Sequence, residues 1–198
     1  MRKSVPFYFI SPNSLTFFRI IFGLTFFFIY TSPSFFGIPP SLLFYLLFLL
    51  LSLSEVSDIL DGYFARKYDY ITEFGKVFDP IVDSLTRNSI FLAFTKPPIS
   101  LPLSLALLFF YRDAVTHLIR IHAALRGVAL PARRSGKIKA IIQATALFAL
   151  LFLFFLEQKG CYDRLYIQSI SRWIVGIVLL YGILSCLEYL HAYMTDST

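Results

Sequence analysis

Six long apolar segments limit what this 198-residue chain can fold into. Short stretches rich in proline, glycine, serine or charge separate them, such as "TSPSFFGIPP" after the first segment and "TKPPIS" after the third. A helix that crosses a bilayer needs about 20 mostly apolar residues. The segments span residues 14–30, 41–63, 77–94, 101–126, 138–156 and 170–192. The sequence therefore predicts an all-α integral membrane bundle of six transmembrane helices, folded as a single domain over residues 1–198.

The composition excludes an ordinary soluble domain. Hydrophobic residues make up 57% of the chain and charged residues only 15%, whereas soluble domains average about 25% charged residues. Two cysteines, Cys161 and Cys186, form neither a disulfide framework nor a CxxC metal motif. The start "MRK" before an apolar run is compatible with a signal peptide, but Arg19 interrupts the run and no small-residue cleavage site follows. A retained first helix is therefore favoured.

Basic residues between the segments predict the orientation in the membrane. The net charge is +6, and no basic soluble face suggests nucleic acid as a partner. Cytoplasmic loops of membrane proteins carry an excess of lysine and arginine. In this chain that excess lies before the first segment and in the second and fourth connections: Arg2, Lys3, Arg66, Lys67, Lys76, Arg126, Arg133, Arg134, Lys137 and Lys139. We therefore expect both termini in the cytoplasm. The expected location is a bacterial inner membrane.

Four aspartates flank the second connection, in the stretch "SDILDGYFARKYDYITEFGKVFDPIVDS". Asp58 and Asp61 are three residues apart, and Asp79 and Asp83 are four apart, so each pair shares one face of a helix. The short connection predicts antiparallel neighbouring helices whose carboxylates meet. Converging carboxylates in a low-dielectric site need cations or must be protonated. An oxygen-only set without histidine suits Mg²⁺ or Mn²⁺, as one ion or a close pair.

Small residues and an arginine accompany the aspartates. Gly62 and Ala65 lie in register with Asp58 and Asp61, and small residues let a bulky ligand or a backbone come close. Arg66 offers a planar donor fork suited to phosphate. A structural alternative is that the aspartates are solvated helix-end carboxylates paired with the basic residues of the connection. Ionisable residues inside membranes usually mark functional sites, which favours the functional interpretation.

The full pattern, D-x2-D-G-x2-A-R-x8-G-x3-D-x3-D, resembles the signature of the CDP-alcohol phosphotransferase family at all eight specified positions. Members of that family are six-helix membrane proteins, usually homodimers, that move a phosphatidyl-type group from a CDP-alcohol to a hydroxyl acceptor and release CMP. The resemblance implies that Asp79 and Asp83 are catalytic, with Asp83 as the base. It implies two divalent ions, Mg²⁺ or Mn²⁺, on four carboxylates: Asp58, Asp61, Asp79 and Asp83. It implies a CDP site lined by five residues: Asp61, Gly62, Ala65, Arg66 and Gly75.

Further stretches bear on the acceptor. Arg112 and Arg120 lie eight residues apart, about two helical turns, and so nearly on one face. An arginine inside an apolar helix is costly without a partner; the partner is an acceptor phosphate or, structurally, Asp113 or the aspartate cluster. These arginines, "PNSLTFFR" (12–19) and "GKIKAIIQ" are similar to the phosphatidylglycerophosphate synthase branch of the family. That similarity implies CDP-diacylglycerol as donor, glycerol 3-phosphate as acceptor, and an acceptor-phosphate site formed by Arg112, Arg120 and Lys137.

Departures from that branch leave other acceptors open. Ser84 stands where the branch often has lysine, and Ala140 and Ile141 stand where threonines are common. The same chemistry on inositol phosphate, inositol, serine or choline is the alternative, and inositol phosphate would use Arg112 and Arg120 equally well. A remote alternative from another class is a cation transporter that uses the carboxylates as an ion site. A cation path is not expected to place arginines near those carboxylates.

Overall fold

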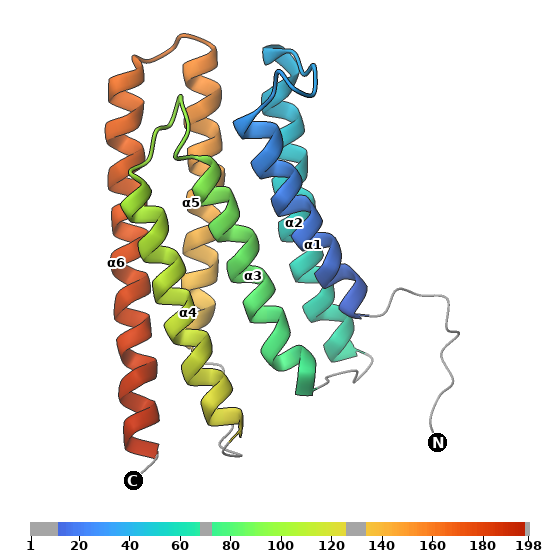
Figure 1. The fold of residues 1–198 in the computed structure, drawn as a ribbon, viewed down its shortest axis with the longest axis vertical. Helices are drawn as coiled ribbons and strands as arrows, with labels where there is room; N and C mark the ends of the chain where they lie inside the picture. The colour runs from blue at the N-terminus through green and yellow to red at the C-terminus, as the bar shows by residue number, and fades with distance from the viewer. Residues whose placement is uncertain (1–11, 68–72, 126–133, 197–198) are drawn as a thin grey trace, which may run out of the picture.

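The computed structural model describes residues 12–67, 73–125 and 134–196, and these residues form six α-helices (Figure 1). The helices are α1 (Pro12–Thr31), α2 (Pro40–Lys67), α3 (Glu73–Ala93), α4 (Leu103–Leu125), α5 (Arg134–Gln158) and α6 (Arg164–Asp196). The description leaves out some side chains within the helices, among them those of Asp61, Ala65, Arg66 and Lys137. The predicted all-α fold is confirmed for the described residues. Helices α2, α5 and α6 extend past their apolar segments because polar residues continue each helix.

The three described connections, α1–α2, α3–α4 and α5–α6, lie together at one end of the bundle (Figure 1). Helix α5 ends there at a glycine: Gly160 has φ 68°, and the amide N–H of Cys161 donates to the carbonyl of Leu156 at 3.0 Å. Glycine adopts this left-handed conformation without steric cost and closes a helix C-terminus. The other end, which we call the polar end, holds the remaining helix termini: Pro12, Lys67, Glu73, Leu125, Arg134 and Asp196.

The bundle interior changes character along its length. Toward the connections it is apolar, and Phe91 of α3 stacks on Phe109 of α4 with ring centroids 4.7 Å apart. Toward the polar end the buried residues become polar or charged: Thr16, Arg19, Ser54, Ser57, Ser84, Arg87, Asn88, Arg112, Asp113, Thr116, Gln143 and Ser185. Buried charges persist only where they are paired or hydrogen-bonded. The apolar half therefore stabilises the bundle, and the polar half is where function is expected.

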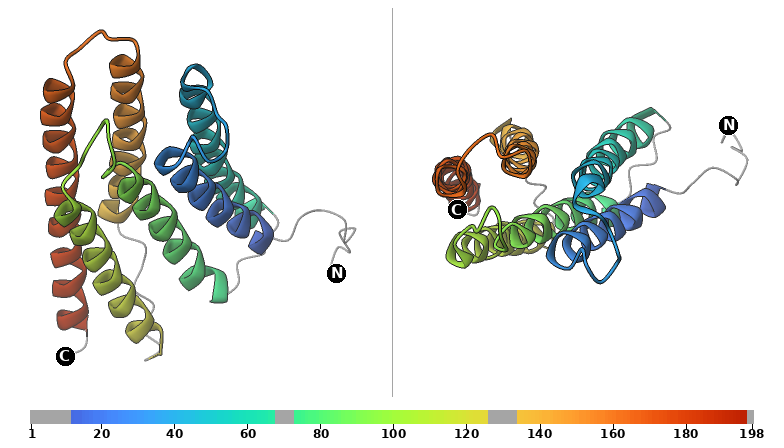
Figure 2. Two further views of the ribbon diagram at one scale, coloured as in Figure 1. Left: turned by 45° about the horizontal axis from the view of Figure 1, so that its top comes forward. Right: turned by 90° about the horizontal axis from the view of Figure 1, so that it is seen from above.

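Helix α1 packs closely against both α2 and α3. Seen along the bundle, α1 and α2 lie on one side and α5 and α6 on the other, while α3 and α4 form a row along one face, with α4 next to α6 and α3 next to α1 (Figure 2). The sequence predicted α2 and α3 as antiparallel neighbours. In the described residues, α2 and α3 contact each other through long side chains, with Arg87 Nη2 lying 3.0 Å from Glu55 Oε2. Each of the two helices packs closely against α1. The expected meeting of their carboxylates is therefore mediated by a third helix.

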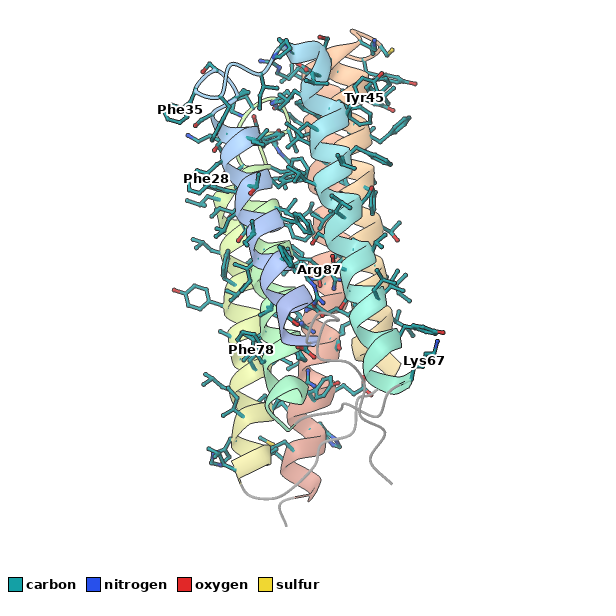
Figure 3. All side chains as sticks on the ribbon, turned by 90° about the vertical axis from the view of Figure 1, so that its right-hand side faces the viewer. Phe28, Phe35, Tyr45, Lys67, Phe78 and Arg87 are labelled. Atoms are coloured by element: carbon teal, nitrogen blue, oxygen red, sulfur yellow. The ribbon has the colours of Figure 1, made fainter. Side chains whose placement is uncertain are left out.

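Three stretches are long and apolar enough to cross a membrane: Pro40–Leu60, Ile138–Gln158 and Arg164–His191. Helix α1 contributes a shorter apolar stretch, Phe18–Thr31. Large hydrophobic side chains cover the outer surface, and Figure 3 shows Phe28, Phe35 and Tyr45 pointing outward, each more than half exposed. Soluble monomers rarely expose apolar surface on this scale. The chain is therefore an integral membrane protein with at least three candidate spans in its described part.

Candidate functional site

A buried arginine of α1 joins the carboxylates of α2 and α3. The Arg19 side chain is 3% exposed, and its Nη1 lies 3.0 Å from Asp58 Oδ1. The same nitrogen donates to Asp83 Oδ1. Figure 3 shows α1 lying across the space between the other two helices. A buried guanidinium needs such partners, since leaving either charge unpaired costs several kcal/mol. Arg19 therefore fixes two of the predicted aspartates close together.

The third described aspartate, Asp79, belongs to the same cluster. Thr16, one turn before Arg19 on α1, donates its hydroxyl to Asp79 Oδ1 at 3.2 Å. The Asp79 carboxylate also interacts electrostatically with Arg19 and with Asp58. Three of the four predicted carboxylates are thus brought together around two side chains of α1, which confirms the expected convergence for Asp58, Asp79 and Asp83.

The chemistry of this cluster fits a hard divalent cation, because its donors are carboxylate and hydroxyl oxygens. Arg19 supplies positive charge at the point where Asp58 and Asp83 meet. Within the side chains that are described, no three His, Cys, Asp or Glu residues surround a common metal position. The Asp61 side chain lies outside that description. The metal site therefore remains a prediction that the donor set supports.

A second arginine extends the charge network. Arg87 of α3 donates through Nε and Nη2 to the two carboxylate oxygens of Glu55, at 3.2 and 3.0 Å. Its Nη2 also lies 3.8 Å from Asp58 Oδ2. Figure 3 shows Arg87 inside the bundle. Carboxylates and arginines therefore alternate from Glu55 through Arg87, Asp58 and Arg19 to Asp83, so that each buried charge has an opposite neighbour.

A basic cluster lies deeper in the bundle, between α3, α4, α5 and α6. Asp113 Oδ1 accepts hydrogen bonds from Arg112 Nη1 and from Lys139 Nζ, each at 2.6 Å. Its Oδ2 accepts from Asn88 Nδ2 at 3.0 Å. Arg112 Nε donates to the carbonyl of Gly182 at 2.7 Å. Arg112 therefore has Asp113 as a partner, the contact that the structural alternative predicted, and its role toward an acceptor phosphate stays a prediction.

A cavity of about 100 Å³ connects the two clusters. Its charged lining comprises Asp83, Arg87, Arg112, Asp113, Arg120 and Lys139. With His117 neutral, four cations and two carboxylates give this lining a net charge of +2. His117 Nε2 and Ser84 Oγ lie 3.0 Å apart on the same wall. The cavity is thus suited to a small anion held beside Asp83.

The structure describes some of the remaining predicted residues and leaves out the side chains of others. Gly62 is half-buried on α2, and Gly75 is buried on α3. Arg120 lines the cavity together with Arg112. The side chains of four others lie outside the described set, so their roles stay predictions: Asp61, Ala65, Arg66 and Lys137.

Sequence reasoning missed several residues of the site. It gave no site role to Arg19 and did not consider Glu55, Arg87 or Asn88, and it chose Lys137 for the acceptor rather than Lys139. One signal was available, because each of these residues is charged or carries an amide inside a largely apolar helix, where such groups are usually functional.

Comparisons with known proteins identify the family of the chain. The family model described as CDP-alcohol phosphatidyltransferase matches residues 9–184. The chain belongs to the CDP-alcohol phosphatidyltransferase family. Within the family, it is 32% identical over 144 residues to a Rickettsia felis protein named CDP-diacylglycerol–glycerol-3-phosphate 3-phosphatidyltransferase, covering 73% of this chain and 76% of that protein.

Two more distant bacterial members of the family carry the same name. The Treponema pallidum protein is 31% identical over 142 residues, which are 69% of this chain and 64% of the relative. The Bacillus subtilis protein is 30% identical over 103 residues, about half of each chain. As a member of this family, the chain is a transferase embedded in a membrane, as the resemblance of its aspartate pattern implied.

Proposed function

We propose that this phosphatidyltransferase moves the phosphatidyl group from CDP-diacylglycerol to glycerol 3-phosphate and releases CMP, forming phosphatidylglycerophosphate. The names of the relatives support this reaction. The observation that carries it is the cavity between Asp83 and the cations Arg112, Arg120 and Lys139. An acceptor with a hydroxyl at one end and a phosphate at the other needs a base near the first group and cations near the second. The cavity offers both, because a carboxylate and several cations line it.

The charge of the cavity favours a phosphorylated acceptor. A phosphate monoester carries a charge of about −1.5 to −2 near neutral pH, which complements the net +2 of the lining. Arginine forks bind phosphate oxygens in pairs, whereas lysine acts as a point charge. Serine, choline and free inositol lack a phosphate and would leave the net positive charge of the lining without an anionic partner. Lys137, two residues before Lys139, is proposed to add to the same wall.

Asp83 is the proposed base. It lies on the cavity wall, where it can take the proton of the acceptor hydroxyl as that oxygen attacks the phosphorus bearing diacylglycerol. The bond between this phosphorus and the oxygen of CMP breaks, and CMP leaves with the bonding electrons. Arg19, beside Asp83, keeps the carboxylate in place before the attack. Asp79, held by Thr16, is the second proposed catalytic carboxylate.

Divalent metal ions are proposed to complete the site. Mg²⁺ or Mn²⁺, most simply a pair, would be held by Asp58, Asp61, Asp79 and Asp83 and would neutralise the pyrophosphate charge. The cytidine diphosphate would lie along α2 and the start of α3, in contact with five residues: Asp61, Gly62, Ala65, Arg66 and Gly75. The small residues let the nucleotide approach the helix backbone, and Arg66 would add a donor fork for phosphate.

The membrane arrangement is part of the proposal. Six spans with both termini in the cytoplasm place the polar end, and with it the aspartates, at the cytoplasmic face of a bacterial inner membrane. The excess of basic residues near that end supports this orientation. Soluble glycerol 3-phosphate then enters from water while the donor lipid keeps its acyl chains in the bilayer. The family resemblance further suggests a homodimer.

The test is CMP release by the purified protein in mixed micelles of detergent and CDP-diacylglycerol with Mg²⁺ or Mn²⁺. Glycerol 3-phosphate, inositol phosphate, inositol and serine are offered separately, and Asp83→Asn serves as the matched inactive control. We expect metal-dependent release with glycerol 3-phosphate alone, and loss of release in the control. Release with a different acceptor would keep the chemistry and refute the acceptor. Folded protein that releases no CMP with any acceptor would refute the proposed reaction.

A further inference from the structure

One buried carboxylate ties together the basic wall of the cavity. The Asp113 side chain is only 4% exposed, although it lies in the middle of α4. Its two oxygens accept three hydrogen bonds, from Arg112 on the same helix, Lys139 on α5 and Asn88 on α3. A lone buried carboxylate is strongly unfavourable, whereas one with three donors is well compensated. Asp113 is therefore the point at which three helices meet through hydrogen bonds.

These bonds fix the direction of both cations. Arg112 uses Nη1 for Asp113 and Nε for the Gly182 carbonyl, so two of its three guanidinium nitrogens are engaged from two sides. Lys139 has a long flexible side chain, and its Nζ is held at 2.6 Å from Asp113. Holding such side chains in advance removes the entropy cost of ordering them when a ligand binds.

We propose that Asp113 is a positioning residue, which holds Arg112 and Lys139 as a fixed pair of cations for the phosphate of the acceptor. The proposal rests on the proposed function. Asp113 is not assigned any contact with the acceptor. It acts through the two cations, which line the same cavity as Asp83 and would so set how far the acceptor hydroxyl lies from the base.

The charge of Asp113 makes the proposal sharply testable. A carboxylate in the wall repels an anionic acceptor, so removal of its charge alone would strengthen binding of glycerol 3-phosphate and lower its KM. Removal of a positioning residue has the opposite effect, because Arg112 and Lys139 lose their fixed geometry. The sign of the change in KM therefore distinguishes the two roles of Asp113.

The experiment measures CMP release for the wild type and Asp113→Asn, varying glycerol 3-phosphate and CDP-diacylglycerol in turn. We expect the KM for glycerol 3-phosphate to rise about tenfold or more, as loss of hydrogen bonds to charged groups predicts. The KM for CDP-diacylglycerol should stay within about twofold, since the hydrogen bonds of Asp113 go to Arg112, Lys139 and Asn88 and not to residues of the aspartate cluster. Glu157→Gln, which removes a carboxylate at the opposite end of the bundle, is the matched control and should match the wild type in both values.

A double variant addresses folding. Asn88→Asp with Asp113→Asn keeps one carboxylate and one amide in the same buried contact but moves the charge from α4 to α3. We expect this protein to fold and to keep the raised KM for glycerol 3-phosphate. If the single variant fails to fold, the KM values are measured on the double variant instead. A KM in either variant that equals or falls below the wild-type value overturns the positioning role. A wild-type protein that shows no release with glycerol 3-phosphate overturns the proposed function instead, and the role of Asp113 with it.

Discussion

The ion pair between Arg87 and Glu55 offers a quantitative test of how α2 and α3 are held together. Two hydrogen bonds join the side chains, at 3.2 and 3.0 Å, and the exposed fractions are 8% for Arg87 and 17% for Glu55. Breaking a fully buried pair costs about 3–5 kcal/mol. Here Arg87 keeps a second carboxylate, Asp58, at 3.8 Å, and Glu55 retains some contact with solvent. We therefore expect a coupling free energy of about 2 kcal/mol.

The chain contains its own control for this prediction. Arg164 also donates through Nε and Nη2 to a glutamate, Glu157, at 3.0 and 2.8 Å, but its side chain is 58% exposed. Exposed ion pairs are worth about 0.2–1 kcal/mol. The two pairs differ in burial and in geometry, because Arg87 donates to both oxygens of Glu55 and Arg164 to Oε1 of Glu157 alone. Both differences predict the larger coupling energy for Arg87 and Glu55.

The assay is a double-mutant cycle on each pair, with unfolding followed in mixed micelles as the fraction of denaturing detergent rises. The variants are Glu55→Gln, Arg87→Gln and their combination, with the same three changes for Glu157 and Arg164. The cycle reports the interaction energy because the single and double changes share all other effects. Equal coupling energies for the two pairs, or a larger value for the exposed pair, would refute the claim that Arg87 and Glu55 form a buried ion pair that stabilises the contact between α2 and α3.

Two further predictions concern α1. Arg19→Met removes the charge between Asp58 and Asp83 and should destabilise the metal-free protein by about 2 kcal/mol. Added Mn²⁺ should then raise the melting temperature more in the variant than in the wild type, and equal shifts would contradict a shared carboxylate cluster. Gly23→Ala should destabilise the bundle by about 1–3 kcal/mol, because its Cβ would lie 2.8 Å from Cγ2 of Thr86. Adding Thr86→Ser to Gly23→Ala removes that methyl group and should recover part of the loss in melting temperature. No recovery would contradict a clash between residues 23 and 86.

The sequence predicted the architecture well because one rule dominates it. Long apolar segments must be helical in a membrane, since every backbone polar group needs an internal partner there. All six segments are helices in the described residues. The bounds were less predictable. Helix α2, for example, was predicted to end at residue 63 and continues to Lys67.

The candidate site was predictable only in part. The spacing of Asp58, Asp79 and Asp83 indicated that they meet, and they do. The spacing gave no sign that α1 would supply Arg19 between them, because contacts between residues far apart in sequence depend on how the helices pack. The place of Lys139 in the cavity lining is similar, because it depends on how α5 lies relative to α3 and α4.

The central claim is that the cations of the cavity recognise the phosphate of the acceptor. The most direct measurement compares kcat/KM for glycerol 3-phosphate with that for glycerol, in the wild type and in Arg120→Gln, with the exposed Arg172→Gln as control. We predict that the variant loses at least about tenfold in the ratio of the two values, because only the phosphorylated acceptor needs Arg120. An equal loss for both acceptors, or an unchanged ratio, would contradict the account.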